Sequence, residues 1–208
     1  MMTKAAPNQL LIATGNRGKI VEFQSLLASL PLRLRNLAEF PKIREIEETG
    51  TTFSDNAVLK ARGYAEQTGL LTLADDSGLE VDALDGAPGV FSARYAGEGA
   101  TDSQRIERLL EELSQCTGQE RHARFVCVIA IADAQGQIAH LSTGRCEGRI
   151  LHAPRGTGGF GYDPVFVPQG FSQTFGELSP EIKQRISHRA LAMQAARSFL
   201  VNRFQSTA

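Results

Sequence analysis

Two adjacent carboxylates, Asp75 and Asp76, come directly after a short apolar run and directly before a serine and a glycine. Residues 70–74 have the length and composition of a buried strand, and Ser77 with Gly78 has the composition of a turn. The pattern therefore predicts that both acids lie at the end of a strand, where α/β proteins commonly bind ligands. Because side chains alternate along a strand, only one of the two aspartates should face a ligand. The residues alone do not say which one.

A second polar segment, residues 14–19, follows a predicted strand at residues 9–14 and precedes an amphipathic helix. Asn16 is a good N-cap for that helix. Unpaired backbone N–H groups and the positive end of a helix dipole make such a loop attractive to anions, and Lys19 and Arg17 add positive charge beside it. We expect phosphate to bind here, although the loop is not a Walker A sequence. The alternative is a capped helix with exposed basic side chains.

A glycine-rich segment, residues 153–167, carries two aromatic side chains and one acid. Its glycines satisfy G-x-G-x-x-G, but a turn and a short strand are predicted to follow, whereas a dinucleotide-binding loop opens a helix. The dinucleotide interpretation is therefore rejected. What remains is a loop in which Phe160 and Tyr162 either stack on a flat heterocycle or pack against the core.

Cations, acids and aromatic rings thus recur in the predicted loops. Lys19, Lys183 and Arg189 can hold phosphate, and the aromatic rings can stack on a base. A triphosphate close to acids would be repelled unless a cation such as Mg²⁺ bridged the carboxylate and phosphate oxygens, and a further carboxylate can deprotonate water. The combination favours hydrolysis of a nucleotide polyphosphate. The acids that could serve are Glu47, Glu48, Asp75 and Asp76.

The rest of the chain alternates between strand and helix patterns, so an α/β fold is predicted. A hairpin in the middle of the chain makes the expected sheet mixed. Thr101 with Gln104 has the spacing of a capping box, and Ser179 with Pro180 is a typical helix start. The remaining expected elements are a strand at residues 32–37, a helix at 53–69, hairpin strands at 124–132 and 137–144, and a final helix after Ser187.

Composition bounds the class of protein. The chain has 208 residues, 42% hydrophobic and 22% charged, as expected for one globular domain with a core at about residues 9–204. A net charge of −1 argues against nucleic acid as a partner. No apolar run reaches the length of a membrane span, so no membrane association is expected. Three cysteines without Cys-x-x-Cys spacing suit a reducing compartment, and we expect a cytoplasmic protein.

In this order along the chain, five motifs resemble those of the inosine/xanthosine triphosphate pyrophosphatase family. The resemblance covers almost the whole chain, and the motifs are jointly specific. They are Thr14-Gly15-Asn16 with Lys19, Glu47-Glu48-Thr49-Gly50, Asp75-Asp76-Ser77-Gly78, Gly158-Gly159-Phe160-Gly161-Tyr162-Asp163-Pro164 and Ser187-His188-Arg189.

The resemblance implies an elongated mixed β-sheet flanked by helices, in a single domain with two lobes and the active site in the cleft between them. It implies a homodimeric, Mg²⁺-dependent enzyme that cleaves dITP, ITP, XTP and related aberrant purine triphosphates to the monophosphate and pyrophosphate. Such an activity removes deaminated bases from the nucleotide pool.

The same resemblance implies roles for individual residues. Asp76 would activate water and contact the metal, and Glu47 would be a second metal ligand, although its neighbour Glu48 could be the ligand instead. Asp75 would then support the site. The substrate-binding residues implied are Thr14, Gly15, Asn16, Arg17, Gly18, Lys19, Ser77, Phe160, Gly161, Tyr162, Asp163, Lys183, His188 and Arg189.

Two other functions remain open at this point. One is a house-cleaning pyrophosphatase that acts on modified pyrimidine nucleotides, which a panel of substrates would distinguish. The other is a nucleotide-sensing module that binds without turnover. In a sensor, the acid at Asp76 should be dispensable, whereas an enzyme that uses it as a general base should lose turnover without it.

Overall fold

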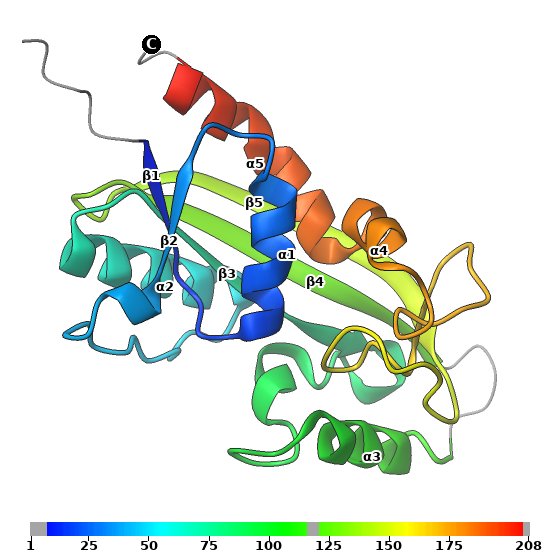
Figure 1. Ribbon diagram of the computed structural model, residues 1–208. Helices are drawn as coiled ribbons and strands as arrows, with labels where there is room; N and C mark the ends of the chain where they lie inside the picture. Colours follow the sequence, from blue (N-terminus) through cyan, green and yellow to red (C-terminus); the bar gives the residue numbers. More distant parts are fainter. Residues whose placement is uncertain (1–7, 116–120, 206–208) are drawn as a thin grey trace, which may run out of the picture. The chain divides into compact units, whose positions relative to one another are not determined.

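The computed structural model describes residues 8–115 and 121–205. Strands and helices alternate through most of this range (Figure 1). In chain order the elements are β1 (Gln9–Ile12), α1 (Arg17–Leu27), β2 (Arg33–Asn36), α2 (Phe53–Thr68), β3 (Thr72–Val81), α3 (Asp102–Glu112), β4 (His122–Ala132), β5 (Ile138–Ile150), β6 (Phe166–Pro168), α4 (Pro180–Ile186) and α5 (His188–Gln205), with short 3-10 helices at Leu37–Glu39, Asp82–Leu84 and Gly89–Arg94.

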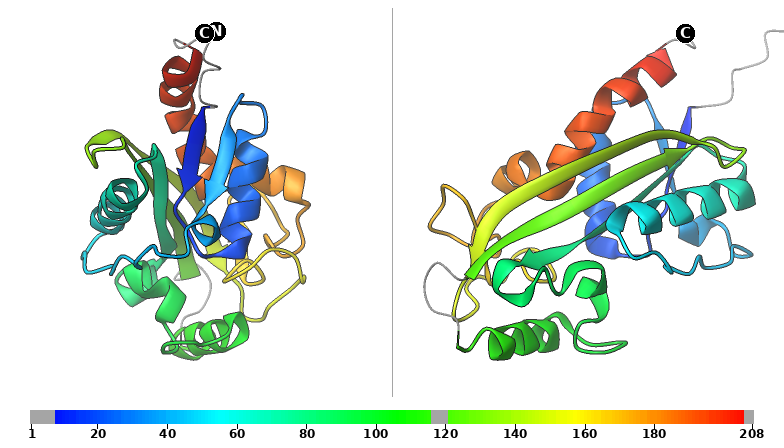
Figure 2. Two further views of the ribbon diagram at one scale, coloured as in Figure 1. Left: turned by 60° about the vertical axis from the view of Figure 1, so that its left-hand side comes forward. Right: turned by 180° about the vertical axis from the view of Figure 1, so that it is seen from behind.

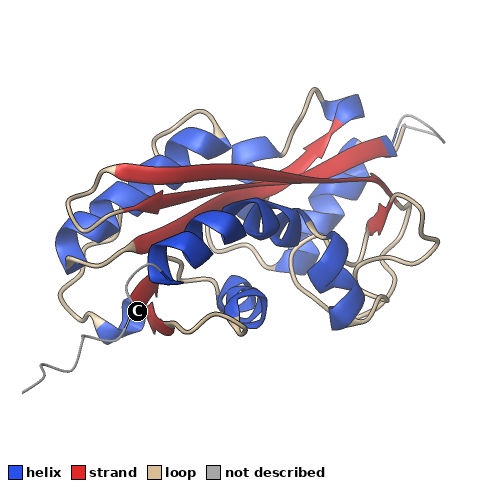
Figure 3. Ribbon diagram, turned by 90° about the horizontal axis from the view of Figure 1, so that it is seen from above, coloured by secondary structure: helices blue, strands red, loops and turns tan. Residues whose placement is uncertain are grey.

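The strands form one sheet with the order β2-β1-β3-β4-β5-β6. β1 pairs in parallel with β2 and with β3, whereas β5 and β6 are antiparallel, so the sheet is mixed. Figure 3 shows helices beside the strands. The predicted α/β class, with a mixed sheet flanked by helices, is confirmed.

The chain divides into two compact units. Unit 1 consists of Met1–Asp75, Val128–Ser142 and Met193–Ala208, and unit 2 consists of Asp76–Cys127 and Thr143–Ala192. The boundary between the units therefore falls between Asp75 and Asp76. A cleft between two lobes stays a prediction.

In unit 1, β1 lies between its parallel neighbours β2 and β3. The connection from β1 to β2 runs one way across the sheet, and the connection from β2 to β3 runs back. Since crossovers between parallel strands are right-handed, the helices of these two connections must cover opposite faces. Figure 2 (left) shows α1 and α2 on opposite sides of β1 and β2. Both helices pack through buried side chains, such as Phe23 of α1 and Ala61 of α2.

Strand β3 does not end where the sequence predicted. It runs without interruption through Thr72–Val81, so Asp75 and Asp76 lie inside a strand rather than at its end. The turn predicted at Ser77 and Gly78 is wrong because β3 lies between β1 and β4 in the sheet, and pairing with neighbours distant in sequence outweighs a local turn preference. β5 extends six residues beyond the predicted hairpin strand for the same reason.

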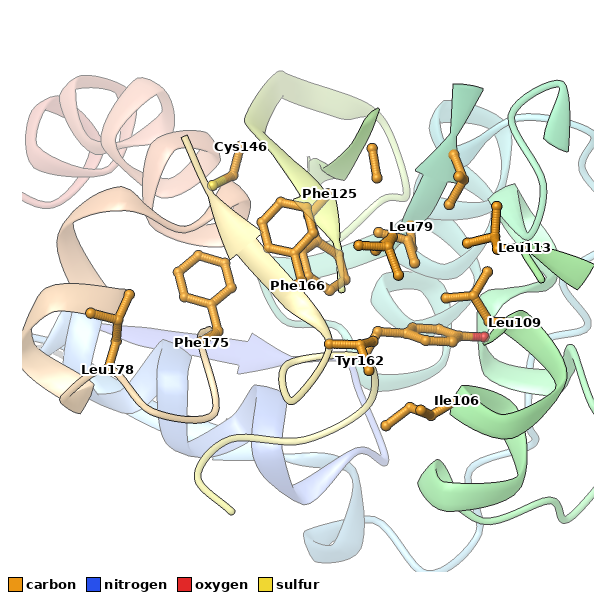
Figure 4. Packing of buried hydrophobic residues seen from close by; sticks show 14 residues of the cluster. Leu79, Ile106, Leu109, Leu113, Phe125, Cys146, Tyr162, Phe166, Phe175 and Leu178 are labelled. Atoms are coloured by element: carbon orange, nitrogen blue, oxygen red, sulfur yellow. The ribbon is translucent and has the colours of Figure 1, made fainter. Parts of the chain in front are cut away.

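Unit 2 has its own hydrophobic core, which gathers side chains from β3, α3, β4, β5 and the segment after β5 (Figure 4). Phe125 and Phe166 lie at its centre, with ring centroids 4.6 Å apart at an angle of 56°, a favourable tilted arrangement. Leu109 and Leu113 cover it from the side of α3 and are completely buried. This core fixes the loop at residues 153–165, because Tyr162 of that loop is part of it.

Within the described ranges, none of the helices is long and apolar enough to cross a membrane.

Candidate active site

The polar loop before α1 forms the predicted cap of that helix. Asn16 is the N-cap of α1, and its side-chain oxygen accepts a hydrogen bond from the backbone N–H of Lys19 at 3.1 Å. Thr14 Oγ1 in turn accepts from the backbone N–H of Asn16 at 3.2 Å. Gly15, Asn16 and Arg17 are exposed, so the first turn of the helix is open to an anion. The predicted cap is confirmed.

Lys19 forms an ion pair with Asp75. The ammonium lies 2.9 Å from Oδ2 of the carboxylate, and the Asp75 side chain is completely buried. A carboxylate removed from water is costly unless a positive charge compensates it, and Lys19 provides that charge. The Asp75 carboxylate therefore holds the Lys19 ammonium in place.

Glu48, rather than Glu47, faces the interior of unit 1. Residues 46–50 run beside α2 with alternating burial: Ile46, Glu48 and Gly50 are half-buried, whereas Glu47 is exposed. The Gly50 N–H donates to Asn56 Oδ1 at 2.8 Å, which fixes the register of this segment against α2. Of the two adjacent glutamates, Glu48 is therefore the one that lies against α2.

Glu48 is held by Lys60, a residue that sequence analysis did not single out. Lys60 lies on α2, is almost completely buried, and donates to Glu48 Oε1 at 2.7 Å. A lysine on the buried side of a helix rarely lacks an acidic partner, so its position among buried alanines was the available signal. The bond fixes the orientation of the Glu48 carboxylate through one of its two oxygens.

In unit 2, Arg189 at the start of α5 is the most deeply buried cation of the predicted site, with 1% of its surface exposed. Its Nη2 donates to Ser77 Oγ at 2.9 Å, which connects it to the residue after Asp76 on β3. Asp76 itself is 6% exposed. His188, the neighbour of Arg189, stacks on Phe125 with ring centroids 4.7 Å apart and an angle of 13°. The core of unit 2 thus orients the His188–Arg189 pair.

Lys183 and Asp163 form a buried ion pair next to Phe160. The Lys183 ammonium lies 2.5 Å from Asp163 Oδ2, and the same oxygen accepts the backbone N–H of Phe160 at 2.8 Å. The Phe160 ring lies 4.7 Å from the Lys183 ammonium and 5.8 Å from the Arg189 guanidinium. Phe160 is half-exposed, so it is an aromatic surface bordered by two cations.

Tyr162 does not share that arrangement. It is 3% exposed, and Figure 4 shows its ring pointing toward Ile106 and Leu109 of α3. Its hydroxyl donates to the backbone carbonyl of Ser92 at 3.0 Å, and burial raises its pKa. Of the two interpretations kept open from sequence, packing against the core describes Tyr162. Of the two aromatic rings in this loop, the half-exposed one is Phe160.

Comparisons with known proteins identify the family. The family model described as "Ham1 family" matches residues 10–199. The chain belongs to the Ham1 family. Curated relatives named dITP/XTP pyrophosphatase include one from Desulforamulus reducens, 50% identical over 192 residues that cover 92% of this chain and 95% of the relative, and one from Nostoc sp., 51% identical over 89% of this chain and 91% of the relative.

The fold agrees with that of solved Ham1 structures. A HAM1 protein from Coxiella burnetii superposes with a TM-score of 0.85 at 44% identity, over 94% of this chain and 99% of that one. The resemblance drawn from the five motifs is thereby confirmed, as is the prediction of an enzyme, since the curated Ham1 relatives carry pyrophosphatase names.

The side chains of this Ham1 chain suit a hard divalent ion in kind. Asp76 and Glu48 offer carboxylate oxygens, the donors that Mg²⁺ prefers in proteins. Each of the two carboxylates has a polar interaction in the structure. Among residues 8–115 and 121–205, no three His, Cys, Asp or Glu side chains gather as a ready-made ligand set.

Proposed function

We propose that this chain hydrolyses aberrant purine nucleoside triphosphates, dITP, ITP and XTP among them, to the nucleoside monophosphate and pyrophosphate. The observation that carries the proposal is the pair of charge arrangements described above, a capped helix N-terminus with Lys19 in unit 1 and a cation-bordered aromatic ring in unit 2. One suits a polyphosphate and the other suits a base. Membership of the Ham1 family and the names of its curated relatives support this assignment.

The phosphate end of the substrate is assigned to residues 14–19. Backbone N–H groups at the start of α1 and the ammonium of Lys19 supply positive charge, while the buried Asp75 carboxylate keeps that ammonium in place. Lys19 is 15% exposed, so it can turn toward a phosphate oxygen without leaving its partner's neighbourhood. Arg17, which is exposed on the first turn of the helix, adds a second cation.

Asp76 is assigned the role of the general base that removes a proton from the attacking water. Glu48, with Asp76, is assigned to Mg²⁺, in place of the Glu47 that sequence analysis named first. When bound, Mg²⁺ would offset the repulsion between these acids and the triphosphate and would stabilise the charge that develops on the phosphate. Lys60 holds the Glu48 carboxylate in one orientation, which leaves less freedom to be lost on binding.

The base is assigned to Phe160 and Arg189. A purine can stack on the half-exposed ring, and the guanidinium, which has only donors, can bond the 6-keto oxygen of hypoxanthine or xanthine. Adenine presents an amino group at that position, so a donor would remain unpaired, at a cost of ~1 to 3 kcal/mol. This arrangement accounts for discrimination against adenine.

The decisive experiment is identification of the products from dITP and Mg²⁺. We expect dIMP and pyrophosphate in equal amounts. Release of orthophosphate with dIDP would contradict the proposal. A faster reaction with modified pyrimidine triphosphates than with dITP, ITP or XTP would show that the substrates are pyrimidine nucleotides instead. GTP and ATP complete the panel, and omission of Mg²⁺ tests the metal.

A catalytic acid distinguishes turnover from mere binding. Asp76→Asn should lower kcat by at least ~10²-fold, as expected for loss of a general base, while the fold is retained. Asp85→Asn is a matched control, because Asp85 is an exposed acid of the same unit. If Asp76→Asn turned over dITP at the rate of the Asp85 variant, the base would be another group.

Two further expectations belong to this proposal. A homodimer, implied by the family resemblance, should give a mass of twice 22.5 kDa by light scattering. A cytoplasmic location fits an enzyme that acts on the nucleotide pool, and cell fractionation would test it.

A further inference from the structure

The half-exposed ring of Phe160 belongs to a tight turn whose backbone is fixed at consecutive residues. The N–H of Asp163 closes the turn on the Phe160 carbonyl at 3.3 Å. Gly161 adopts φ +61°, in the left-handed region that glycine enters at little cost. The Phe160 N–H is held by the Asp163 carboxylate. The direction in which the ring points therefore depends on what holds the next N–H, that of Gly161.

The Gly161 N–H is held by Asp102, a residue 59 positions earlier in the chain. It donates to Asp102 Oδ2 at 2.7 Å, a length typical of a charge-assisted hydrogen bond. Asp102 is the first residue of α3, and Thr101 caps that helix through a complete capping box with Gln104. The acceptor of the Gly161 N–H thus belongs to a helix of unit 2 rather than to another loop.

Arg105 fixes the Asp102 carboxylate from behind. Its Nη2 contacts the other carboxylate oxygen, Oδ1, and its Nη1 donates to the carbonyls of Ala100 at 2.6 Å and Ala93 at 2.9 Å. With one oxygen on Arg105 and one on Gly161, Asp102 has little freedom to rotate. Two carboxylates from different parts of unit 2, Asp102 and Asp163, therefore hold two successive N–H groups of the turn.

We propose that Asp102 is a positioning residue for recognition of the base: it holds the turn at Gly161 in the conformation that presents the Phe160 ring. The proposal rests on the proposed function only in assigning the base to Phe160. Neither the five motifs nor the names of the relatives assign a role to Asp102. Its side chain acts through the turn and contacts the substrate nowhere in this scheme.

Steady-state kinetics with dITP test the functional part. Asp102→Ala removes the acceptor and should raise KM about fivefold or more, as for loss of a charge-assisted hydrogen bond, with kcat within about twofold because Asp76 and Lys19 are untouched. Asp102→Asn keeps an oxygen that can accept the Gly161 N–H, so it should restore most of the affinity. Glu107→Ala on the exposed side of α3 is the matched control.

A second measurement needs no activity. The chain has no tryptophan, so Phe160→Trp introduces a single fluorophore at the ring in question. Adding Asp102→Ala should increase acrylamide quenching of this tryptophan by about twofold or more, whereas Asp102→Asn and Glu107→Ala should leave it unchanged. Asp102→Ser, which suits a helix start but is too short to reach Gly161, replaces Asp102→Ala if that variant does not fold.

The outcomes separate the possibilities. Equal quenching in the Asp102→Ala and Glu107→Ala proteins would overturn the proposal. If Asp102→Asn is as impaired as Asp102→Ala, the ion pair with Arg105 matters rather than the bond to Gly161, and the proposal also fails. If the wild-type protein does not hydrolyse dITP, the proposed function fails, but the quenching experiment still decides whether Asp102 holds the turn.

Discussion

The ammonium of Lys19 and the carboxylate of Asp75 form an ion pair whose two members differ sharply in exposure. Their closest atoms are 2.9 Å apart, the Asp75 side chain has no exposed surface, and the Lys19 side chain retains 15%. Lys19 comes from the first turn of α1 and Asp75 from the middle of β3. The pair therefore joins the predicted phosphate loop to the strand that also carries Asp76.

This difference in exposure predicts an asymmetry between two substitutions. Lys19→Met leaves a buried carboxylate without its counter-ion and should lower the free energy of unfolding by ~3 kcal/mol. Asp75→Asn leaves a lysine that can reach water, so the loss should be only ~1 kcal/mol. Urea unfolding of the two variants measures this difference. Equal losses, or a larger loss in Asp75→Asn, would show that the pair does not compensate the buried charge as described.

The two neighbouring glutamates should differ in their effect on the metal. Glu48→Gln should raise the Mg²⁺ concentration needed for half-maximal activity by about tenfold or more, because it removes a charged oxygen donor and releases Lys60. Glu47→Gln, at the exposed neighbouring position, should change this concentration less than about twofold. Titration of activity with Mg²⁺ at saturating dITP compares them, and the reverse order would restore Glu47 as the ligand.

Gly144 of β5 is predicted to be irreplaceable, because α5 begins directly against it. A Cβ at this position would lie 2.1 Å from the His188 carbonyl oxygen and 2.3 Å from the Ala192 nitrogen, both backbone atoms. Gly144→Ala should therefore push the start of α5 away, with a loss of ~1 to 3 kcal/mol of stability and a raised KM, since Arg189 moves with it. Thermal unfolding and dITP kinetics are the measurements.

Thr143→Ala, at the exposed neighbour on the same strand, is the control for that substitution and should behave like the wild type. Unchanged stability and KM in the Gly144→Ala protein would mean that α5 can shift without disturbing the site.

His140 should make stability depend on pH. It stacks on Phe199 with ring centroids 5.1 Å apart, and burial lowers its pKa below 6.5. In the folded state it stays neutral while the unfolded chain binds a proton, so stability should fall as the pH falls through 6.5. His140→Phe keeps an aromatic ring but has no titratable group at this position. When the pH falls from about 8 to about 5.5, this variant should therefore lose less stability than the wild type. Urea unfolding at the two pH values measures this, and an equal loss of stability in the two proteins would contradict the prediction.

Local sequence signals predicted those parts of the fold that depend on a few neighbouring residues. The N-cap at Asn16 and the capping box at Thr101 are present, and α2 ends within one residue of the predicted helix. Helix caps and helical turns are formed by residues three or four positions apart, so a short segment of sequence is enough to predict them. The order of the motifs was also enough to identify the family.

Features that depend on residues distant in the sequence could not be predicted in this way. The predicted end of a strand at Asp76 was wrong, because Ser77 and Gly78 read locally as a turn while the sheet supplies neighbours on both sides. Glu47 and Glu48 were left as alternatives by the sequence, and the contact with α2 was needed to tell which one points inward. Tyr162 and Phe160 looked equivalent until the core of unit 2 was seen to contain only the first.

The sequence by itself thus determined the family, the α/β class, the helix starts and the inventory of charged and aromatic groups. Tertiary structure decided how those groups are used: that Asp75 neutralises Lys19, that Glu48 rather than Glu47 meets Lys60, and that α3 supplies an acceptor to Gly161. The physical reason is the separation of the partners along the chain. An ion pair or a hydrogen bond between residues 12 to 59 positions apart leaves no periodic trace in the sequence and exists only once the elements have packed.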